Sequence, residues 1–241
     1  MSGKAWAVFA IIIAAIFGGI IWNNNQARLD ISDISKEAAL AIRQAEERNG
    51  NIGDRVKGNP QAKVLLIEYG DFQCGPCRSV HPDVKAVVDK YPEHVALVYR
   101  NFPIGTSHPN ARAAAAAAEA AGQQGKYWEM HDLIYDKQDE WASAQANDRN
   151  AIFSGYAKQL GLNEQQFTND MANPEISKKI NFDMALVRLN QVQSTPTFYL
   201  NGEQLKLTNT TSISSAVEEA LKKQGVAIEP AAKPSTETPA E

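Results

Sequence analysis

The feature that most constrains this chain is a pair of cysteines separated by two residues, Cys74-Gly75-Pro76-Cys77, because the 241 residues contain no other cysteine. An apolar run, residues 64–67, leads into the pair. The segment from Arg78 to Asp89 has the periodicity of a helix. We therefore expect a strand, a short turn and a helix, with the first cysteine capping that helix.

This position predicts unequal chemistry for the two thiols. Backbone N–H groups and the positive end of the helix dipole stabilise an anion at a helix N-terminus, which lowers the pKa of a cysteine there. Cys74 is the predicted nucleophile. Cys77 lies one turn further in, where it is more shielded and suited to closing a disulfide within the pair.

Two other interpretations of the pair remain open. A structural zinc site needs four nitrogen or sulfur ligands, whereas the chain offers two thiols and four scattered histidines (His81, His94, His108, His131). A purely structural disulfide between residues so close together would constrain little of the unfolded chain. We therefore expect redox chemistry, with no metal and no cofactor.

Size and composition limit the classes of protein to which the chain can belong. With 44% apolar residues and a net charge of −4, the chain can bury one core and a subsidiary lobe. Its Lys and Arg residues are scattered, which argues against nucleic acid as a partner. Two cysteines exclude a disulfide scaffold but leave the redox compartment undecided.

The N-terminus favours a membrane protein. Residues 5–22 form an uncharged stretch of 18 residues, long enough to span a bilayer. A cleavable signal has a shorter apolar core and a small-residue cleavage site, so we predict an uncleaved transmembrane anchor. Lys4 favours a cytoplasmic location for residues 1–4 although Arg28 follows the span, which places the catalytic domain on the extracytoplasmic side of the cell membrane. A cleaved signal or a buried helix are the alternatives.

The rest of the chain divides into three parts. Residues 23–57 are predicted to be a helical spacer, and residues 58–226 the globular domain. Residues 227–241 are predicted to be a disordered tail with little apolar surface. The apolar residues that recur at helical spacing in the spacer are Ile31, Ile34, Ala38, Ala41, Ile42 and Ala45.

The globular domain has the pattern of an α/β fold. Residues 64–69 and 95–100 are predicted to be buried strands, and the helix at 78–90 between them makes them parallel. A helical insertion of four or five helices follows at about 104–190. The turn Asn201-Gly202 then joins two strands, 197–200 and 204–207, into a hairpin, and a helix at 212–223 closes the domain.

This order of elements resembles the thioredoxin fold, and its details resemble the DsbA-like branch of exported thiol–disulfide oxidoreductases. The similarity covers about residues 58–225 and implies a central mixed sheet with an inserted helical subdomain. The stretches that carry it are residues 58–64, 71–74, 99–103, 124–131 and 194–202.

The resemblance implies a substrate-binding role for Thr195 and Pro196. It predicts that the Thr195–Pro196 bond is cis and that Pro196 packs beside Cys74, where Thr195 offers its backbone N–H and C=O to an extended substrate strand. The alternative is an ordinary trans proline at the start of a strand.

The resemblance also places a buried acid, Glu68, beneath the cysteines. A carboxyl group in an apolar strand has a raised pKa and can exchange a proton with Cys77 through water. The alternative is a carboxylate that reaches solvent. We expect His81 to be a partly exposed helix residue, with tuning of the thiols as the alternative, and His108 and His131 to be structural.

The sequence therefore predicts a membrane-anchored thiol–disulfide oxidoreductase that forms disulfides in cysteine-containing exported proteins. A membrane redox partner or a small-molecule oxidant would regenerate it. Gly75-Pro76 is the dipeptide of reducing thioredoxins, so a disulfide reductase or isomerase is the alternative. A tethered peptide-binding chaperone is an alternative of another class.

Overall fold

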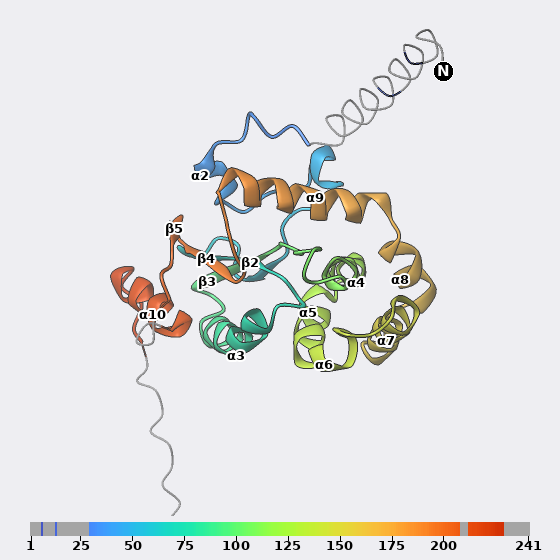
Figure 1. Cartoon of the computed structure of the whole chain (residues 1–241). Helices are drawn as coiled ribbons and strands as arrows, with labels where there is room; N and C mark the ends of the chain where they lie inside the picture. Colours follow the sequence, from blue (N-terminus) through green and yellow to red (C-terminus); the bar gives the residue numbers. More distant parts are fainter. Residues whose placement is uncertain (1–5, 7–12, 14–28, 208–211, 229–241) are drawn as a thin grey trace, which may run out of the picture. The chain divides into compact units, whose positions relative to one another are not determined.

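The computed structural model describes residues 6, 13, 29–207 and 212–228 and divides the chain into two units, Met1–Ser35 and Lys36–Glu241 (Figure 1). The predicted anchor, apart from Trp6 and Ile13, and most of the predicted tail lie outside the described residues. Within the described part of the chain, no helix has the length and apolar character needed to cross a bilayer.

The second unit is built on a five-stranded mixed sheet in the order β1-β3-β2-β4-β5. Its strands are β1 (Val56–Gly58), β2 (Val64–Gly70), β3 (Val95–Asn101), β4 (Thr197–Leu200) and β5 (Glu203–Gln204). The central pair, β2 and β3, is parallel, as predicted, and the other three pairs are antiparallel. The buried residues of the two central strands are almost continuous, which suits strands covered on both faces.

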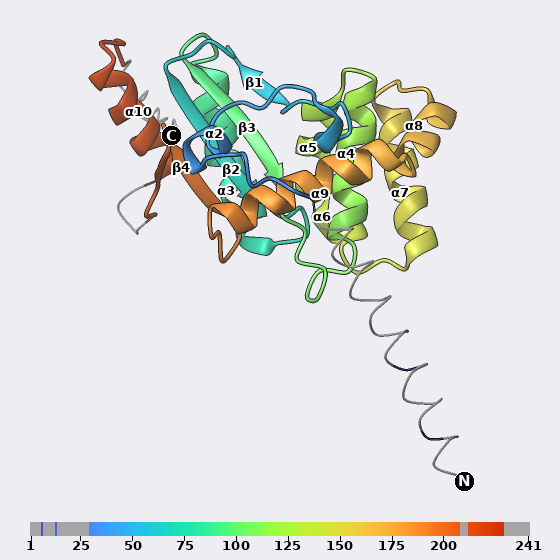
Figure 2. The same ribbon diagram turned by 90° about the horizontal axis from the view of Figure 1, so that it is seen from above.

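Helices cover both faces of this sheet. The two helices α3 (Gly75–Lys90) and α10 (Ile213–Lys223) lie on one face, and α9 (Pro174–Leu189) lies on the other (Figures 1 and 2). The core between the sheet and the first pair of helices includes Val64, Leu66, Val84, Val88, Val95, Leu97, Val217 and Leu221.

The predicted helical insertion is confirmed, but it contains six helices and not four or five. They are α4 (Ala111–Gln123), α5 (Tyr127–Asp136), α6 (Gln138–Trp141), α7 (Ala146–Gln159), α8 (Glu164–Met171) and α9. The alanine run makes α4 the centre of this lobe, because its small side chains let α5, α8 and α9 pack closely against it. The short α6 has no helical period long enough to be recognised in a sequence.

The hairpin after the insertion is also confirmed. Asn201 and Gly202 both have positive φ angles, 51° and 85°, as a tight hairpin turn requires. The strand after the turn is shorter than predicted and ends at Gln204. The closing helix begins as expected, since the Ser212 side chain accepts a hydrogen bond from the backbone N–H of Ser215.

The prediction of a helical spacer at residues 23–57 is wrong for its described part, residues 29–57. This part contains one helical turn, α2 (Lys36–Ala39), a 3-10 turn, η1 (Glu47–Asn49), and most of β1. The guanidinium of Arg100 on β3 donates hydrogen bonds to the carbonyls of Ala39 and Ala41, so these two carbonyls bond to the domain. The folded domain therefore begins before the predicted boundary at residue 58.

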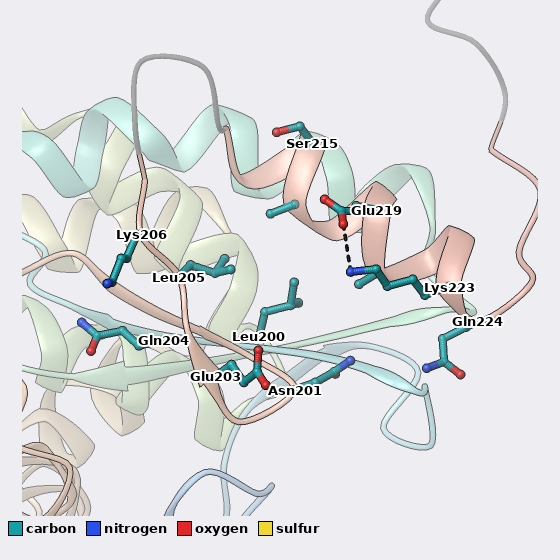
Figure 3. A pocket seen from close by; sticks show the side chains of 12 residues that line it. Leu200, Asn201, Glu203, Gln204, Leu205, Lys206, Ser215, Glu219, Lys223 and Gln224 are labelled. Carbon is teal, nitrogen blue, oxygen red and sulfur yellow. Dashed lines mark ion pairs between the residues drawn. The ribbon is translucent and has the colours of Figure 1, made fainter.

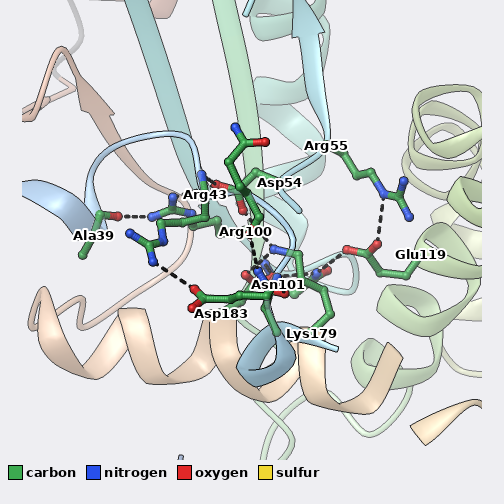
Figure 4. A network of polar contacts seen from close by, with 12 residues as sticks. Ala39, Arg43, Asp54, Arg55, Arg100, Asn101, Glu119, Lys179 and Asp183 are labelled. Atoms are coloured by element: carbon green, nitrogen blue, oxygen red, sulfur yellow. Dashed lines mark hydrogen bonds and ion pairs between the residues drawn. The ribbon is translucent and has the colours of Figure 1, made fainter. Parts of the chain in front are cut away.

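A buried polar network fixes this segment, here called the strap (residues 36–55), to the domain (Figure 4). The carboxylate of Asp54 accepts from Arg100 at 2.8 Å and from Lys179 of α9 at 2.9 Å, and Lys179 also contacts Asp183 at 2.7 Å. All four side chains are buried. The network joins the strap, the sheet and the helical lobe.

Candidate active site

Cys74 lies at the start of α3, where it is the N-cap residue, with φ −74° and ψ 122°. Pro76 occupies the first turn, where the missing N–H of proline costs nothing. Cys74 retains 5% of its exposure, whereas Cys77, one turn further along the helix, is fully buried. The predicted start of the helix at the first cysteine is therefore confirmed.

The two thiols differ strongly in pKa because of their surroundings at the start of α3. The hydrogen bond from Cys77 lowers the pKa of Cys74 to about 6, against the effect of burial. The same hydrogen bond and burial raise the pKa of Cys77 far above its ordinary value. Cys74 is thus the group that carries a thiolate near neutral pH.

The loop before β4 lies directly against Cys74. The Thr195–Pro196 peptide bond is cis, as the resemblance implies. The Sγ atom of Cys74 lies 3.5 Å from the carbonyl oxygen of Thr195, close enough for a sulfur hydrogen bond. The buried hydroxyl of Thr195 has no hydrogen-bond partner within the described part of the chain.

Glu68 lies beneath the pair and not at the surface. It is on β2 with the same orientation as Val64 and Leu66, which face α3, and it is 2% exposed. Burial, with a smaller contribution from Cys74, raises the pKa of Glu68 to about 8. A negative charge on Glu68 in turn raises the pKa of Cys77. Burial of the carboxyl group is confirmed, and the solvent-exposed alternative is wrong.

Two residues that hold the active-site loop were not predicted. Gln138 donates from Nε2 to the carbonyls of Phe72 and Cys74, at 2.7 and 3.2 Å. The buried Asp71 accepts from the backbone N–H of Ile104 at 2.8 Å. Asp71 lies within a motif of the resemblance, whereas Gln138 carries no local signal because its two partners lie more than sixty residues away.

The histidine predictions need one correction. His81 was expected to be partly exposed, but it is 5% exposed because α5 covers that face of α3. Its ring stacks on Tyr135 with centroids 5.1 Å apart. His131 of α5 is 2% exposed, and His108 contacts the Asp71 carboxylate through Nδ1 at 2.8 Å.

A separate open pocket lies between β5 and α10 (Figure 3). Its lining includes Leu200, Leu205 and the ion pair of Glu219 with Lys223. Neither the cysteines nor Glu68, Thr195 or Pro196 contribute to it. It is therefore distinct from the redox site.

Comparison with known proteins agrees with this geometry. The family model described as Thioredoxin matches residues 50–220. The chain belongs to the thioredoxin family. The match begins within the strap, in agreement with the earlier start of the domain.

Solved structures narrow the fold within this family. A thioredoxin-like oxidoreductase from Silicibacter pomeroyi DSS-3 is 28% identical, with a TM-score of 0.59, and the match covers 76% of this chain and 99% of that one. Two further matches are α-DsbA1 from Wolbachia pipientis (20% identical, TM-score 0.62, 79% and 95% covered) and the thiol-disulfide oxidoreductase MdbA from Corynebacterium diphtheriae (19%, 0.57, 75% and 94%). The fold is that of the DsbA-like branch, which confirms the resemblance.

Curated sequences also match part of this thioredoxin-family chain. A protein from Salinispora arenicola named Na(+)/H(+) antiporter NhaA 1 is 38% identical over 151 residues, or 63% of this chain. The match covers 22% of that protein, so the chain spans about a fifth of the length of the curated relatives it matches. The similarity is therefore to one region of larger proteins.

Proposed function

We propose that this chain is a membrane-anchored thiol–disulfide oxidoreductase that forms disulfides in exported proteins. The observation that carries the proposal is the contact of the Cys74 sulfur with the carbonyl of Thr195, 3.5 Å away, immediately before a cis proline. A nucleophilic thiol beside an accessible backbone segment can hold an extended peptide and exchange sulfur with it.

The reaction begins with the Cys74–Cys77 disulfide. A substrate thiolate attacks Cys74, a mixed disulfide forms, and Cys77 leaves as a thiolate that must take up a proton. Glu68, whose pKa burial raises to about 8, is protonated near neutral pH and can supply that proton. A second substrate thiolate then attacks the substrate sulfur of the mixed disulfide, which releases an oxidised substrate and the Cys74 thiolate.

The acidity of Cys74 supports the oxidising direction of this exchange. An oxidoreductase is a strong oxidant when its reduced form is stabilised, and a lowered pKa of the nucleophilic cysteine is one such stabilisation. Cys74 has this property, since its pKa is about 6. The Gly75-Pro76 dipeptide favours the second candidate, a disulfide reductase or isomerase of the same compartment.

The proposed function includes a location at the membrane, a class of substrate and a redox partner. The uncharged stretch at residues 5–22 supports a single membrane anchor with the domain on the extracytoplasmic side. Substrates would be cysteine-containing exported proteins that add a short strand beside Thr195. A membrane redox partner or a small oxidant would reoxidise the pair after each turnover.

The deciding experiment is the reduction potential of the cysteine pair. The purified chain is equilibrated in glutathione buffers, its thiols are trapped by alkylation, and the oxidised fraction is measured by mass spectrometry. We expect a potential between about −270 mV, the value for thioredoxin, and about −120 mV, the value for DsbA, because the pKa of Cys74, about 6, lies between those of their nucleophilic cysteines, about 7 and about 3.5. A value near that of thioredoxin would assign the chain to the reductases, and a Cys77→Ser variant, which cannot close the disulfide, is the control.

A further inference from the structure

Behind the cysteine pair, three side chains that suit a metal ion converge between two helices. His81 lies on α3, one turn after Cys77, and His131 and Asp132 are neighbours on α5. One potential ligand atom from each lies within 4.8 Å of the others. Both imidazoles are more than nine-tenths buried, whereas the Asp132 side chain retains 19% of its exposure.

Two of the three separations are close to those of a tetrahedral site. Metal–ligand bonds of about 2.0–2.1 Å at tetrahedral angles place neighbouring ligand atoms roughly 3.3 Å apart. The Oδ1 atom of Asp132 lies 3.2 Å from Nδ1 of His131 and 3.6 Å from Nε2 of His81. A shift of a few tenths of an ångström would bring both pairs to coordination distance, and the two imidazole nitrogens lie within 4.8 Å of each other.

One nitrogen atom of this group has no hydrogen-bond partner. The Nε2 atom of His81 is buried and has no hydrogen-bond partner in the described ranges 29–207 and 212–228. Buried polar atoms are nearly always satisfied, so an orphan of this kind calls for a missing water or ion. A cation between His81 and Asp132 would satisfy it.

We propose that His81, His131 and Asp132 form a binding site for a divalent transition-metal ion, of which Zn²⁺ is the natural probe, and that the bound ion braces α3 against α5 behind the cysteine pair. Two imidazoles and one carboxylate are a donor set that Zn²⁺ accepts, with a fourth position left for water.

The protonation states agree with this assignment. Burial is the main cause that lowers the pKa of His81, and it lowers that of His131 to about 4, so both rings are neutral near pH 7. Metal ligation requires this neutral form. With its proton on Nε2, the neutral ring of His131 would present the lone pair of Nδ1 to the ion in place of its hydrogen bond with Asp132.

An ion could reach the site from solvent beside Asp132, where two lysines compete with it for the carboxylate. Asp132 is the partly exposed member, so an ion would enter on its side. There the ammonium groups of Lys85 and Lys57 lie 3.2 and 3.9 Å from its carboxylate. Both lysines also contact Asp89, at 2.7 and 2.9 Å, and can remain paired with it when an ion takes Asp132.

The test must exclude metal binding by the cysteines themselves. The full chain carrying Cys74→Ser and Cys77→Ser is therefore titrated with Zn²⁺ by calorimetry and with Co²⁺ by visible absorption. We expect one equivalent of either ion to bind, a Co²⁺ spectrum of the tetrahedral type and a melting temperature that rises with Zn²⁺ concentration. No saturable binding in the micromolar to millimolar range would overturn the proposal and leave the redox function untouched.

Matched variants locate the site. His81→Phe keeps the ring that stacks on Tyr135 and removes the ligand, and Asp132→Asn changes a partly exposed side chain without changing its size. Each should weaken binding by about 100-fold or more, because loss of an outer-shell partner alone costs about 10–100-fold. His94→Ala, at an exposed histidine, should bind as the parent does. Unchanged binding in both folded site variants would place the ion elsewhere and refute the assignment.

Discussion

Two thiols in one helical turn have opposite acidities because a single hydrogen bond acts on them in opposite directions. The Cys77 thiol stabilises the anion on Cys74, and it cannot ionise itself without losing that bond. Cys77 is also fully buried, so its own anion would be poorly solvated. The pair therefore behaves as one nucleophile and one resolving thiol.

This difference predicts selective alkylation. In the reduced protein at pH 7, iodoacetamide should label Cys74 and leave Cys77 unlabelled, because only Cys74 is a thiolate and partly accessible. The labelling rate should reach half of its maximum near pH 6. Mass-spectrometric mapping checks both points, and early label on Cys77 would reverse the assignment.

Glu68→Gln should slow exchange while it raises stability. The amide fills the same space but cannot donate a proton to Cys77, so turnover should fall by up to about 100-fold, the lower end of a general acid–base contribution. Stopped-flow measurement of dithiol oxidation from pH 6 to 9 tests this. An unchanged rate across that range would show that Glu68 does not serve the thiols.

The stability effect of Glu68→Gln has a defined pH window. The folded protein raises the pKa of Glu68 from an ordinary value of 4.5 to about 8, so the folded state holds this proton more tightly than the unfolded state. Stability is therefore lost as the pH rises from about 4.5 to 8, at roughly 1.4 kcal/mol per pH unit at most. The variant should escape this loss, whereas Glu93→Gln, at an exposed acid, should not.

Local sequence patterns predict the strands, helix start and turn whose hydrogen bonds are made with near neighbours. Apolar runs predict β2 and β3, and Asn201-Gly202 predicts the hairpin. The helical periodicity after the cysteine pair predicts that α3 starts there. The backbone groups of these elements form hydrogen bonds with near neighbours or within one sheet. Recognition of the family added the cis bond at Thr195 and the burial of Glu68.

The errors share a different cause, which is contact between distant segments. The apolar spacing of residues 29–57 predicts a helix, but Arg100, about sixty residues later, donates hydrogen bonds to the carbonyls of Ala39 and Ala41. His81 was expected to be partly exposed because α5, fifty residues later, covers it only in three dimensions. Periodicity within one segment cannot report either contact.

Asp54 supplies the negative charge that holds the strap against Arg100 and Lys179. Asp54→Asn keeps the size of the side chain but leaves Arg100 and Lys179 buried with less negative charge, which should cost about 3–5 kcal/mol of unfolding free energy. Urea denaturation at pH 7 measures the loss. Asp139→Asn is the matched control, because the ion pair of Asp139 with Arg78 is exposed.

The pH dependence of Asp54 has the opposite sign to that of Glu68. Although burial opposes ionisation, Arg100 and Lys179 lower the pKa of Asp54 well below its ordinary value of 3.8. Its contribution to stability is therefore complete above pH 4 and is lost as the pH falls below it. Asp54→Asn should flatten the acid side of the stability curve, and an unchanged acid limb would contradict the role of the network.

The redox domain and the N-terminal stretch make separate contributions to the proposed function. The domain contains both cysteines, with Glu68 beneath them and the Thr195–Pro196 loop beside Cys74. The stretch at residues 5–22 would determine which thiols the site meets, because an anchored domain samples only proteins that pass its membrane surface.

This division predicts that the full chain stays with the membrane fraction after alkaline carbonate extraction, with residues 1–22 intact. The physical reason is the length of the uncharged stretch, 18 residues, which matches the thickness of a bilayer core and exceeds the apolar core of a cleavable signal. Replacing Ile12 and Ile13 with lysine should release the chain, since each charge at the centre of a span costs about 2.5–3.5 kcal/mol of insertion free energy. The released protein should keep the reduction potential of the parent. N-terminal sequencing that begins beyond Trp22 would show instead that the stretch is a signal removed on export, and the redox site would then act free of the membrane.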